Sequence, residues 1–400
     1  MQQPFNTSRK RIESVDILRG IVMVIMALDH VRDFFHIHGN TDDPLNLATT
    51  TPSLFFTRFI THFCAPVFVF LSGTSIYLQS LRKTKNELSI FLLKRGLWLI
   101  LAEVTLVTLG ITFNPFYNFV VLQVIWAIGI SMVIMALLVK THFKFILALG
   151  VVIVLGHNLL DIPEAVPGLK PGFWWDLFHS ARFAVYPFAP NHFIAILYPF
   201  VPWTGLMMLG YCTGTWFSPT YTAPQRQRIL LVLGTGILLL FVVVRFINIY
   251  GDPVPWTIQK KAFYTFLSFI KVNKYPPSLM YMSITIGVAL VMLSLLENVR
   301  NRFTGIMRIY GRTAFFYYII HFYLAHLLAA IVFFARGHSM QDAIQSAQNL
   351  PFLFIIPNEG FGLAVVYLVW LAVVVALYPV CKWYDRYKSN HKEKWWLSYL

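Results

Sequence analysis

Long apolar segments that carry almost no charge follow one another along this chain. A helix needs about 20 apolar residues to cross a bilayer, and segments of that length recur throughout the 400 residues. Only 12% of the residues are charged, whereas a soluble domain has about 25%. We therefore expect an all-α, polytopic membrane bundle and exclude a soluble enzyme. The sequence predicts ten membrane-spanning helices, at roughly 15–36, 54–81, 90–112, 117–139, 143–160, 191–216, 229–249, 278–297, 309–335 and 361–384.

The remaining segments do not predict a second domain. The Pro-rich and aromatic stretch 161–190 is typical of a loop in the membrane interface, where Trp and Tyr are enriched. We expect one membrane domain over 15–385, a cytoplasmic N-terminal segment 1–14 and a cytoplasmic tail 386–400. The three cysteines are far apart in the sequence, so they predict neither a disulfide framework nor a metal site.

The basic residues predict the orientation of the bundle. The net charge is +15, and 20 of the 32 Lys and Arg residues fall on the side of the two termini, against eight on the opposite side. Because positive residues are retained in the cytoplasm, this bias places both termini there. The membrane orientation thus accounts for the excess of positive charge, and nucleic-acid binding is not required to explain it. The loop 250–277 is an exception with four lysines: either it meets an anionic extracytoplasmic partner, or the spans around it are misplaced.

The first expected span carries ionisable residues that are costly inside a bilayer and usually mark function. Arg19 and His30 are eleven residues apart, which places them on one helix face and about 16 Å apart along the axis. Asp16 lies three residues before Arg19, and Asp33 lies three residues after His30, so each can pair with its neighbour. One face therefore presents a cation near the cytoplasm and an imidazole with a carboxylate further out.

The end of this span has two interpretations. Asp29, Arg32 and Asp33 are either the solvated end of the helix, or one of the two carboxylates orients the imidazole of His30. Arg19 fits a solvated position less well, because the apolar run GIVMVIMAL follows it directly.

The second expected span places two more ionisable residues near the outer surface. Arg58 and His62 are four residues apart and share a helix face. Pro66 would kink the helix just beyond them. Since a short outer loop joins the first two spans, we expect His62 to approach His30.

Other polar residues in the spans are less specific. Ten of the twelve histidines fall on the outer side, which favours a polar site in the outer half of the bundle. None has the spacing and carboxylate of a helical zinc pair, so we expect no metal. Glu103 is expected to pair with Arg95 or Arg312, with a catalytic role as the alternative. His321 and His326 point about 140° apart on one helix, so at most one should face the core.

Several segments resemble one family. RIESVDILRGIVMVIMALDHVRDFF and THFCAPVFVFLSGTS look like the start of the heparan-alpha-glucosaminide N-acetyltransferase-like membrane proteins of bacteria. YPFVPWTGLMMLGY, KYPPSLMYM and YGRTAFFYYIIHFYLAH continue the resemblance, in order, to about residue 335. The family belongs to a wider transmembrane acyltransferase superfamily whose glycan O-acetylating members carry an Arg, ten residues and a His in the first span. Arg19 and His30 stand at that separation.

The resemblance implies that acyl-CoA binds from the cytoplasm and that the acyl group reaches a glycan at the outer face. His30 would be the general base or a transient acyl carrier, since His suits proton transfer near neutral pH. In the lysosomal animal member the catalytic His lies in the loop after the first span, so His36 and His38 remain alternatives. The expected catalytic group is His30, Asp29, Asp33, His62 and Arg58. The expected donor-binding group, which would hold the CoA phosphates, is Arg19, Asp16, Arg95 and Arg312.

We thus expect an acetyl-CoA-dependent acyltransferase of the bacterial inner membrane that acts on a sugar amine or hydroxyl. Its partners would be acyl-CoA, an extracytoplasmic glycan or amino sugar, and membrane lipids, but no nucleic acid; a homodimer is left open. The alternative is a secondary transporter or flippase. Transporters often contain inverted repeats, and the first span has no counterpart in the second half of the chain.

Overall fold

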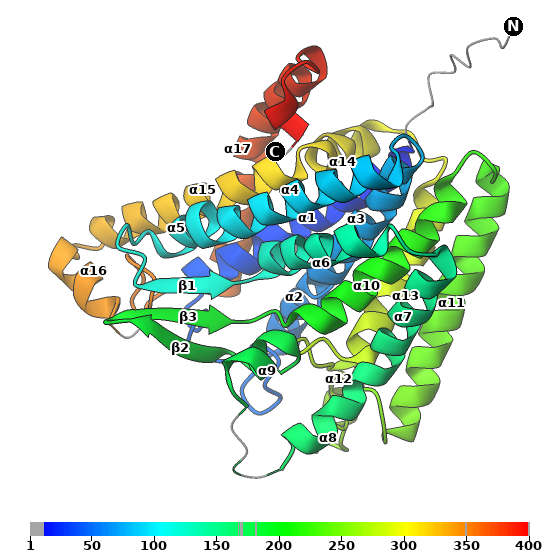
Figure 1. The fold of residues 1–400 in the computed structure, drawn as a ribbon. Helices are drawn as coiled ribbons and strands as arrows, with labels where there is room; N and C mark the ends of the chain where they lie inside the picture. The colour runs from blue at the N-terminus through cyan, green and yellow to red at the C-terminus, as the bar shows by residue number, and fades with distance from the viewer. Residues whose placement is uncertain (1–11, 167, 169–170, 181, 349, 399–400) are drawn as a thin grey trace, which may run out of the picture.

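The computed structural model describes residues 12–166, 168, 171–180, 182–348 and 350–398. It is mostly helical (Figure 1). Six of its helices are long and apolar enough to cross a membrane, and the expectation of a helical membrane bundle is confirmed to that extent. These six are Pro52–Ser80, Phe143–Glu164, Ala223–Ile247, Leu279–Leu296, Ala314–Ala335 and Leu363–Asn390.

Each of the ten expected segments contains at least one helix, although several are interrupted. The first has the length of a span but carries six charged residues. The principal helices are α1 (Glu13–Phe35), α2 (Pro52–Thr61), α3 (Cys64–Ser80), α4 (Lys85–Ala102), α5 (Thr108–Thr112), α6 (Val124–Leu138), α7 (Phe143–Gly156), α10 (Phe200–Thr213), α11 (Ala223–Ile247), α12 (Ala262–Ile270), α13 (Leu279–Leu296), α14 (Arg302–Arg312), α15 (Ala314–Ala335), α16 (Met340–Ser346) and α17 (Leu363–Asn390).

The interruptions fall beside polar residues. The expected second span breaks at His62 and Phe63 into α2 and α3, and Pro66 lies in the first turn of α3. The expected ninth span breaks at Thr313 into α14 and α15. A π-helical turn, η1 (Glu103–Val107), joins α4 to α5; such turns often accompany functional sites.

The expectation of a purely α-helical chain is wrong for one small region. β1 (Phe119–Leu122), β3 (His192–Ile196) and β2 (Ala184–Ala189) form a three-stranded sheet in that order. β1 pairs with β3 in parallel, and β2 pairs with β3 antiparallel. The fourth and sixth expected spans therefore begin as strands, and the expected interfacial loop contains α8 (Asp161–Glu164), α9 (Phe173–Phe178) and β2. Short runs of β-branched and aromatic residues resemble a buried helix in hydropathy alone.

Glycines bring α1 and α14 into close contact. A Cβ atom at Gly20 would lie 1.8 Å from the carbonyl oxygen of Met307, and one at Gly311 would lie 1.8 Å from that of Asp16. Small residues allow such close approach between membrane helices. This packing sets the start of α1, with Asp16 and Arg19, against the end of α14.

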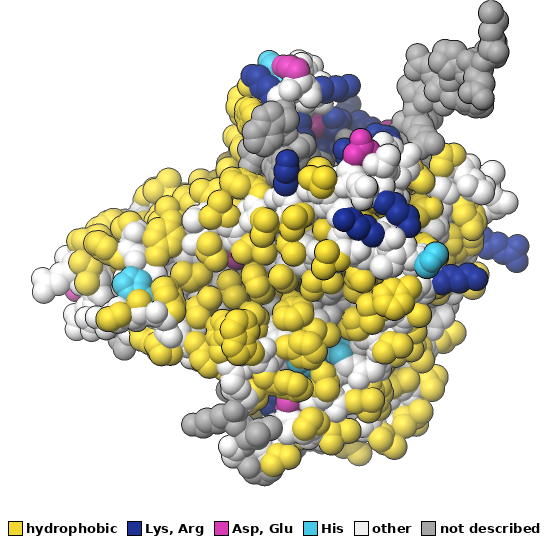
Figure 2. Space-filling view, viewed as in Figure 1, with side chains coloured by type: hydrophobic (Ala, Val, Ile, Leu, Met, Phe, Trp, Pro, Cys, Tyr) yellow, Lys and Arg dark blue, Asp and Glu magenta, His cyan; other side chains and the backbone are white. Residues whose placement is uncertain are grey.

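The surface agrees with a membrane location. Figure 2 shows basic side chains gathered at the upper end of the molecule, and hydrophobic side chains over most of the rest of this face. α1 begins and α17 ends at that upper end (Figure 1). Cys64, Cys212 and Cys381 are buried and unbridged. Most of the expected N-terminal segment 1–14 lies outside the described residues.

Candidate active site

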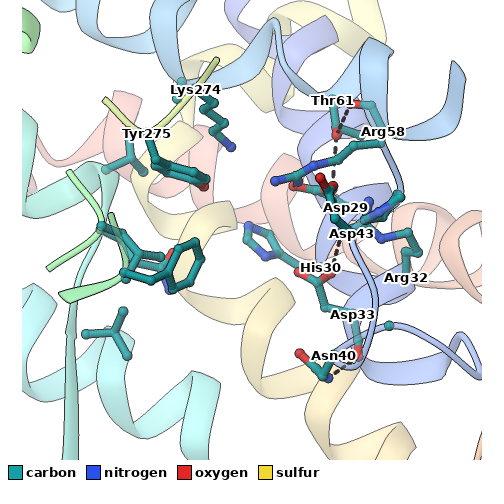
Figure 3. Close-up of a pocket in the computed structure, with 18 of the residues that line it drawn as sticks. Asp29, His30, Arg32, Asp33, Asn40, Asp43, Arg58, Thr61, Lys274 and Tyr275 are labelled. Carbon is teal, nitrogen blue, oxygen red and sulfur yellow. Dashed lines mark hydrogen bonds and ion pairs between the residues drawn. The ribbon is translucent and has the colours of Figure 1, made fainter. Parts of the chain in front are cut away.

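A cavity of about 810 Å³, the outer cavity, holds all five residues of the expected catalytic group. His30 and its neighbours on α1 form one side, Arg58 and His62 adjoin them, and residues of the small sheet and of α15 contribute further walls. The loop before α13 closes the opposite side with Lys274 and Tyr275 (Figure 3). Segments far apart in the sequence therefore meet around His30.

Asp29 is the centre of a buried ion network rather than part of a solvated helix end. It is 7% exposed. Its carboxylate accepts hydrogen bonds from Arg58 and, at 3.0 Å, from the Thr61 hydroxyl, and it lies 3.1 Å from Arg32 Nη2. This network ties α1 to α2 and fixes the helix turn that carries His30.

His30 reaches into the cavity from this turn. Its ring centroid lies 4.2 Å from that of Phe322 and 5.2 Å from that of His321, both on α15. Figure 3 shows its imidazole directed across the cavity toward Lys274 and Tyr275. The expected partner Asp33 also lines the cavity, but its carboxylate pairs with Arg32. Phe322 and His321 therefore hold the ring by packing, and its edge remains open to the cavity.

Lys274 and Tyr275 are site residues that sequence reasoning did not single out. The Lys274 ammonium nitrogen lies 5.1 Å from the Tyr275 ring centroid and 5.9 Å from that of Tyr198. Burial disfavours ionisation of the Tyr275 phenol, but the charges of Lys274 and Arg58 outweigh it and lower the pKa of Tyr275 below its ordinary value. The signals that could have found these residues were the exceptional lysines of loop 250–277 and the segment KYPPSLMYM.

A second cavity, the inner cavity, measures about 790 Å³ and is strongly basic. None of its described lining residues is Asp or Glu. Arg19 lines it, and its guanidinium donates to Asp16 at 3.0 Å, Ser75 at 3.1 Å and the Gly311 carbonyl at 3.3 Å. The basic side chains around this cavity are Arg19, Lys83, Arg95, Arg312, Lys388, Lys392 and Lys394.

The inner cavity contains three of the four residues expected to bind the donor. Arg19, Arg95 and Arg312 line it, whereas Asp16 pairs with Arg19 without lining it. Arg312 Nε also lies 2.9 Å from Asp385 of α17. The end of α17 and the tail after it supply further lysines, a contribution that the sequence alone did not indicate.

A single layer of side chains separates the two cavities. Phe68 of α3, Val124 at the start of α6 and Tyr318 of α15 line both of them. Glu103 fixes the part of this layer that α6 contributes: its carboxylate accepts the backbone N–H of Trp126 at 2.7 Å and so anchors the first turn of α6, which carries Val124. The expected pairing of Glu103 with Arg95 or Arg312 is therefore replaced by helix capping.

The other histidines occupy different positions. His36 follows the end of α1 and forms an isolated parallel β-bridge with Phe361. Neither His36 nor His38 is among the residues that line the outer cavity. His321 and His326 are both fully buried, so the expectation that at most one faces the core is wrong. His326 lies 2.7 Å from the Leu353 carbonyl and 3.2 Å from the Gly110 carbonyl, contacts outside the helix that the helical angle could not reveal.

One group of described residues, away from both cavities, has atoms close enough to bind a metal ion. Single ligand atoms of Asp161, Glu164 and His179 lie within 4.8 Å of one another. The Glu164 carboxylate already accepts hydrogen bonds from His179 and Trp175, each at 2.7 Å. These bonds account for the cluster as a structural network between α8 and α9.

Comparison with known protein families finds that this chain matches one of them. A sequence model described as heparan-alpha-glucosaminide N-acetyltransferase, catalytic, matches residues 11–246. The matched region includes α1, with Arg19 and His30, and ends before Lys274 and Tyr318. No curated protein matches the chain.

Proposed function

Because the chain belongs to the heparan-alpha-glucosaminide N-acetyltransferase family, a family of membrane acetyltransferases, we propose that it moves an acetyl group from cytoplasmic acetyl-CoA to an extracytoplasmic sugar amine or hydroxyl. One observation carries this proposal. A basic cavity and a cavity that contains His30 meet at one layer of side chains, formed by Phe68, Val124 and Tyr318. A donor bound in the first cavity needs only to pass this layer to reach the second.

The proposed topology has both termini in the cytoplasm of a bacterial cell and about ten membrane crossings. The six long apolar helices would be supplemented by α1, by the α4–α5 run, by α6 and by α10. The shorter helices can serve as crossings only if their neighbours complete the span, and in this proposal the small sheet does so for α6 and α10. The basic inner cavity then opens to the cytoplasm, where acetyl-CoA is made available.

The inner cavity suits the nucleotide end of acetyl-CoA. The phosphates of CoA carry several negative charges, and Arg and Lys side chains form strong charge-assisted hydrogen bonds to them. Seven basic side chains surround this cavity, without a described carboxylate in its lining. In the proposed complex, Arg19, Arg95 and Arg312 hold phosphates while the uncharged pantetheine arm points toward the separating layer.

The outer cavity suits the transfer itself. His30 takes the proton from the acceptor amine or hydroxyl as its nitrogen or oxygen attacks the thioester carbonyl. Among the described residues, no hydrogen bond joins the Asp29 carboxylate to the His30 imidazole. Asp29 instead fixes α1 against α2 through its ion pair with Arg58. In this proposal Asp29 and Arg58 are positioning residues, and His30 is the catalytic one.

The test is transfer of labelled acetyl from acetyl-CoA to glycan or amino-sugar acceptors by the full chain in lipid nanodiscs. The wild type should transfer label, and His30→Ala should lower kcat roughly 100-fold to 10,000-fold, the range typical of lost general-base catalysis. His36→Ala and His38→Ala are the matched controls and should keep near-normal rates. A wild type without transfer, or an active His30→Ala, would contradict the proposal. Acceptor uptake into liposomes without acetyl-CoA would instead favour the transporter.

A further inference from the structure

Tyr318 has a buried hydroxyl group whose hydrogen-bonding capacity is unused. The residue is 3% exposed, and its Oη atom has no hydrogen-bond partner among the described residues. Buried polar atoms in native proteins nearly always have partners, so an exception calls for an explanation such as a ligand. The neighbouring atom His321 Nε2 is unpartnered as well.

The position of Tyr318 indicates what the missing partner is. It is one of the three residues that line both cavities. Of these three, Phe68 and Val124 are apolar, so Tyr318 alone brings a hydrogen-bond donor to the boundary. Its ring centroid lies 5.7 Å from that of His321 and 5.4 Å from that of Phe322, the two rings that pack on His30. The hydroxyl thus belongs to the side-chain group around the proposed catalytic base.

We propose that Tyr318 is a catalytic residue that donates its Oη–H to the carbonyl oxygen of the acetyl thioester. This inference rests on the proposed function. An acetyl group carried from the inner to the outer cavity must pass Tyr318, and its carbonyl oxygen is the polar atom that needs a donor there. Donors placed where negative charge develops provide one of the largest contributions to catalysis.

The step balances without any further reactant. The acceptor nitrogen or oxygen forms a bond to the carbonyl carbon while its proton passes to His30, and the carbonyl electron pair moves to the oxygen. Tyr318 donates its hydrogen bond to this oxyanion. When the carbonyl re-forms, the C–S bond breaks, and the CoA thiolate takes the proton from the His30 imidazolium and leaves as the thiol.

Tyr317 provides a matched control at the next position. Its hydroxyl is also buried without a described partner. However, Tyr317 is not among the lining residues of either cavity, and its ring stacks on His321 with centroids 5.6 Å apart. Removing either hydroxyl leaves the ring in place, so the two substitutions differ mainly in whether the lost group faces the path of the acetyl group.

The experiment compares Tyr318→Phe with Tyr317→Phe in the full chain, using labelled acetyl transfer. We expect Tyr318→Phe to lower kcat about 100-fold to 1,000-fold, the loss typical of one oxyanion donor, while Tyr317→Phe stays within about twofold. A Tyr318→Phe protein with wild-type kcat overturns the inference and leaves the proposed function intact. A wild type that transfers no acetyl overturns both.

A binding measurement keeps the inference falsifiable if Tyr318→Phe is poorly active for structural reasons. Free CoA lacks the carbonyl, so both proteins should bind it equally. A non-reactive ketone analogue, in which CH₂ separates the carbonyl from sulfur, should bind Tyr318→Phe about threefold to tenfold more weakly, the loss of one hydrogen bond. Equal weakening for both ligands would indicate a structural defect and overturn the inference.

Discussion

The outer and inner cavities are nearly equal in size, about 810 and 790 Å³, but they differ in the charged residues that line them. The outer cavity has four acidic residues (Asp29, Asp33, Asp42 and Asp43) and four basic ones (Arg32, Arg58, Lys271 and Lys274) in its lining. The lining of the inner cavity has seven basic side chains and no described acidic one. Where acidic and basic side chains are equal in number, they can pair with one another and fix the geometry without a ligand. Where basic side chains are in excess, a bound anion can neutralise their charge. This contrast supports the proposal that the outer cavity carries out the transfer and that the inner cavity binds the donor.

The largest effect should follow from breaking the balance of the outer cavity. Asp29→Asn would leave Arg58 buried beside a neutral group, and losing one partner of a buried ion pair costs about 3–5 kcal/mol. We expect a corresponding fall in the free energy of unfolding, measured by denaturation in detergent. Asp42→Asn, at an exposed position on the same cavity, should change stability little. Equal stability of the two variants would show that the network is not structural.

A smaller effect should follow in the inner cavity and appear in binding rather than in stability. Arg95→Gln removes one charge-assisted phosphate contact, worth about 1.5–3 kcal/mol. The dissociation constant for acetyl-CoA should therefore rise roughly tenfold to a hundredfold, as measured by calorimetry, with kcat nearly unchanged at saturating donor. Lys271→Gln in the outer cavity is the control and should leave donor binding unaltered. If both variants weaken the donor equally, the assignment of the two cavities is wrong.

The smallest effect concerns the tail. Lys392 is exposed and lies at the edge of the inner cavity, and exposed ion pairs contribute about 1 kcal/mol or less. Lys392→Ala should raise KM for acetyl-CoA about twofold to fivefold, but leave KM for acetyl-pantetheine, which lacks the nucleotide phosphates, unchanged. Lys144 is exposed and is not among the lining residues, so Lys144→Ala should affect neither substrate. The same KM shift for both donors would exclude a phosphate contact.

The sequence could predict which residues of the first two spans lie together, because these spans carry their polar residues within a short distance. Arg19 pairs with Asp16, Arg58 and His62 line one cavity with His30, and α1 is one continuous helix from Glu13 to Phe35. Helical periodicity is a local property, and it predicted these relations. The roles of these residues stay predictions until they are tested.

Other expectations failed where contacts come from distant segments. The pairing of Glu103 could not be read from its own helix, because its partner is the start of α6 in a neighbouring segment. Similarly, hydropathy predicts the start of a span where strand β3 lies, because the pairing of β3 with β1 is not visible in hydropathy. Lys274 and Tyr275 are far from His30 in the sequence, and only the packing of the loop before α13 brings them to the same cavity.

The order of residues along the chain was sufficient to predict that the protein lies in a membrane, where its apolar segments run, and that Arg19 and His30 share one helix. These properties follow from hydropathy and from the 3.6-residue period, which depend on neighbours along the chain. The packing of the helices was needed to show that these two residues line different cavities, that Asp29 binds Arg58, and that Tyr318 lies between the cavities. Those relations depend on which helices pack together, because buried ions and hydroxyls take partners from wherever the packing brings them.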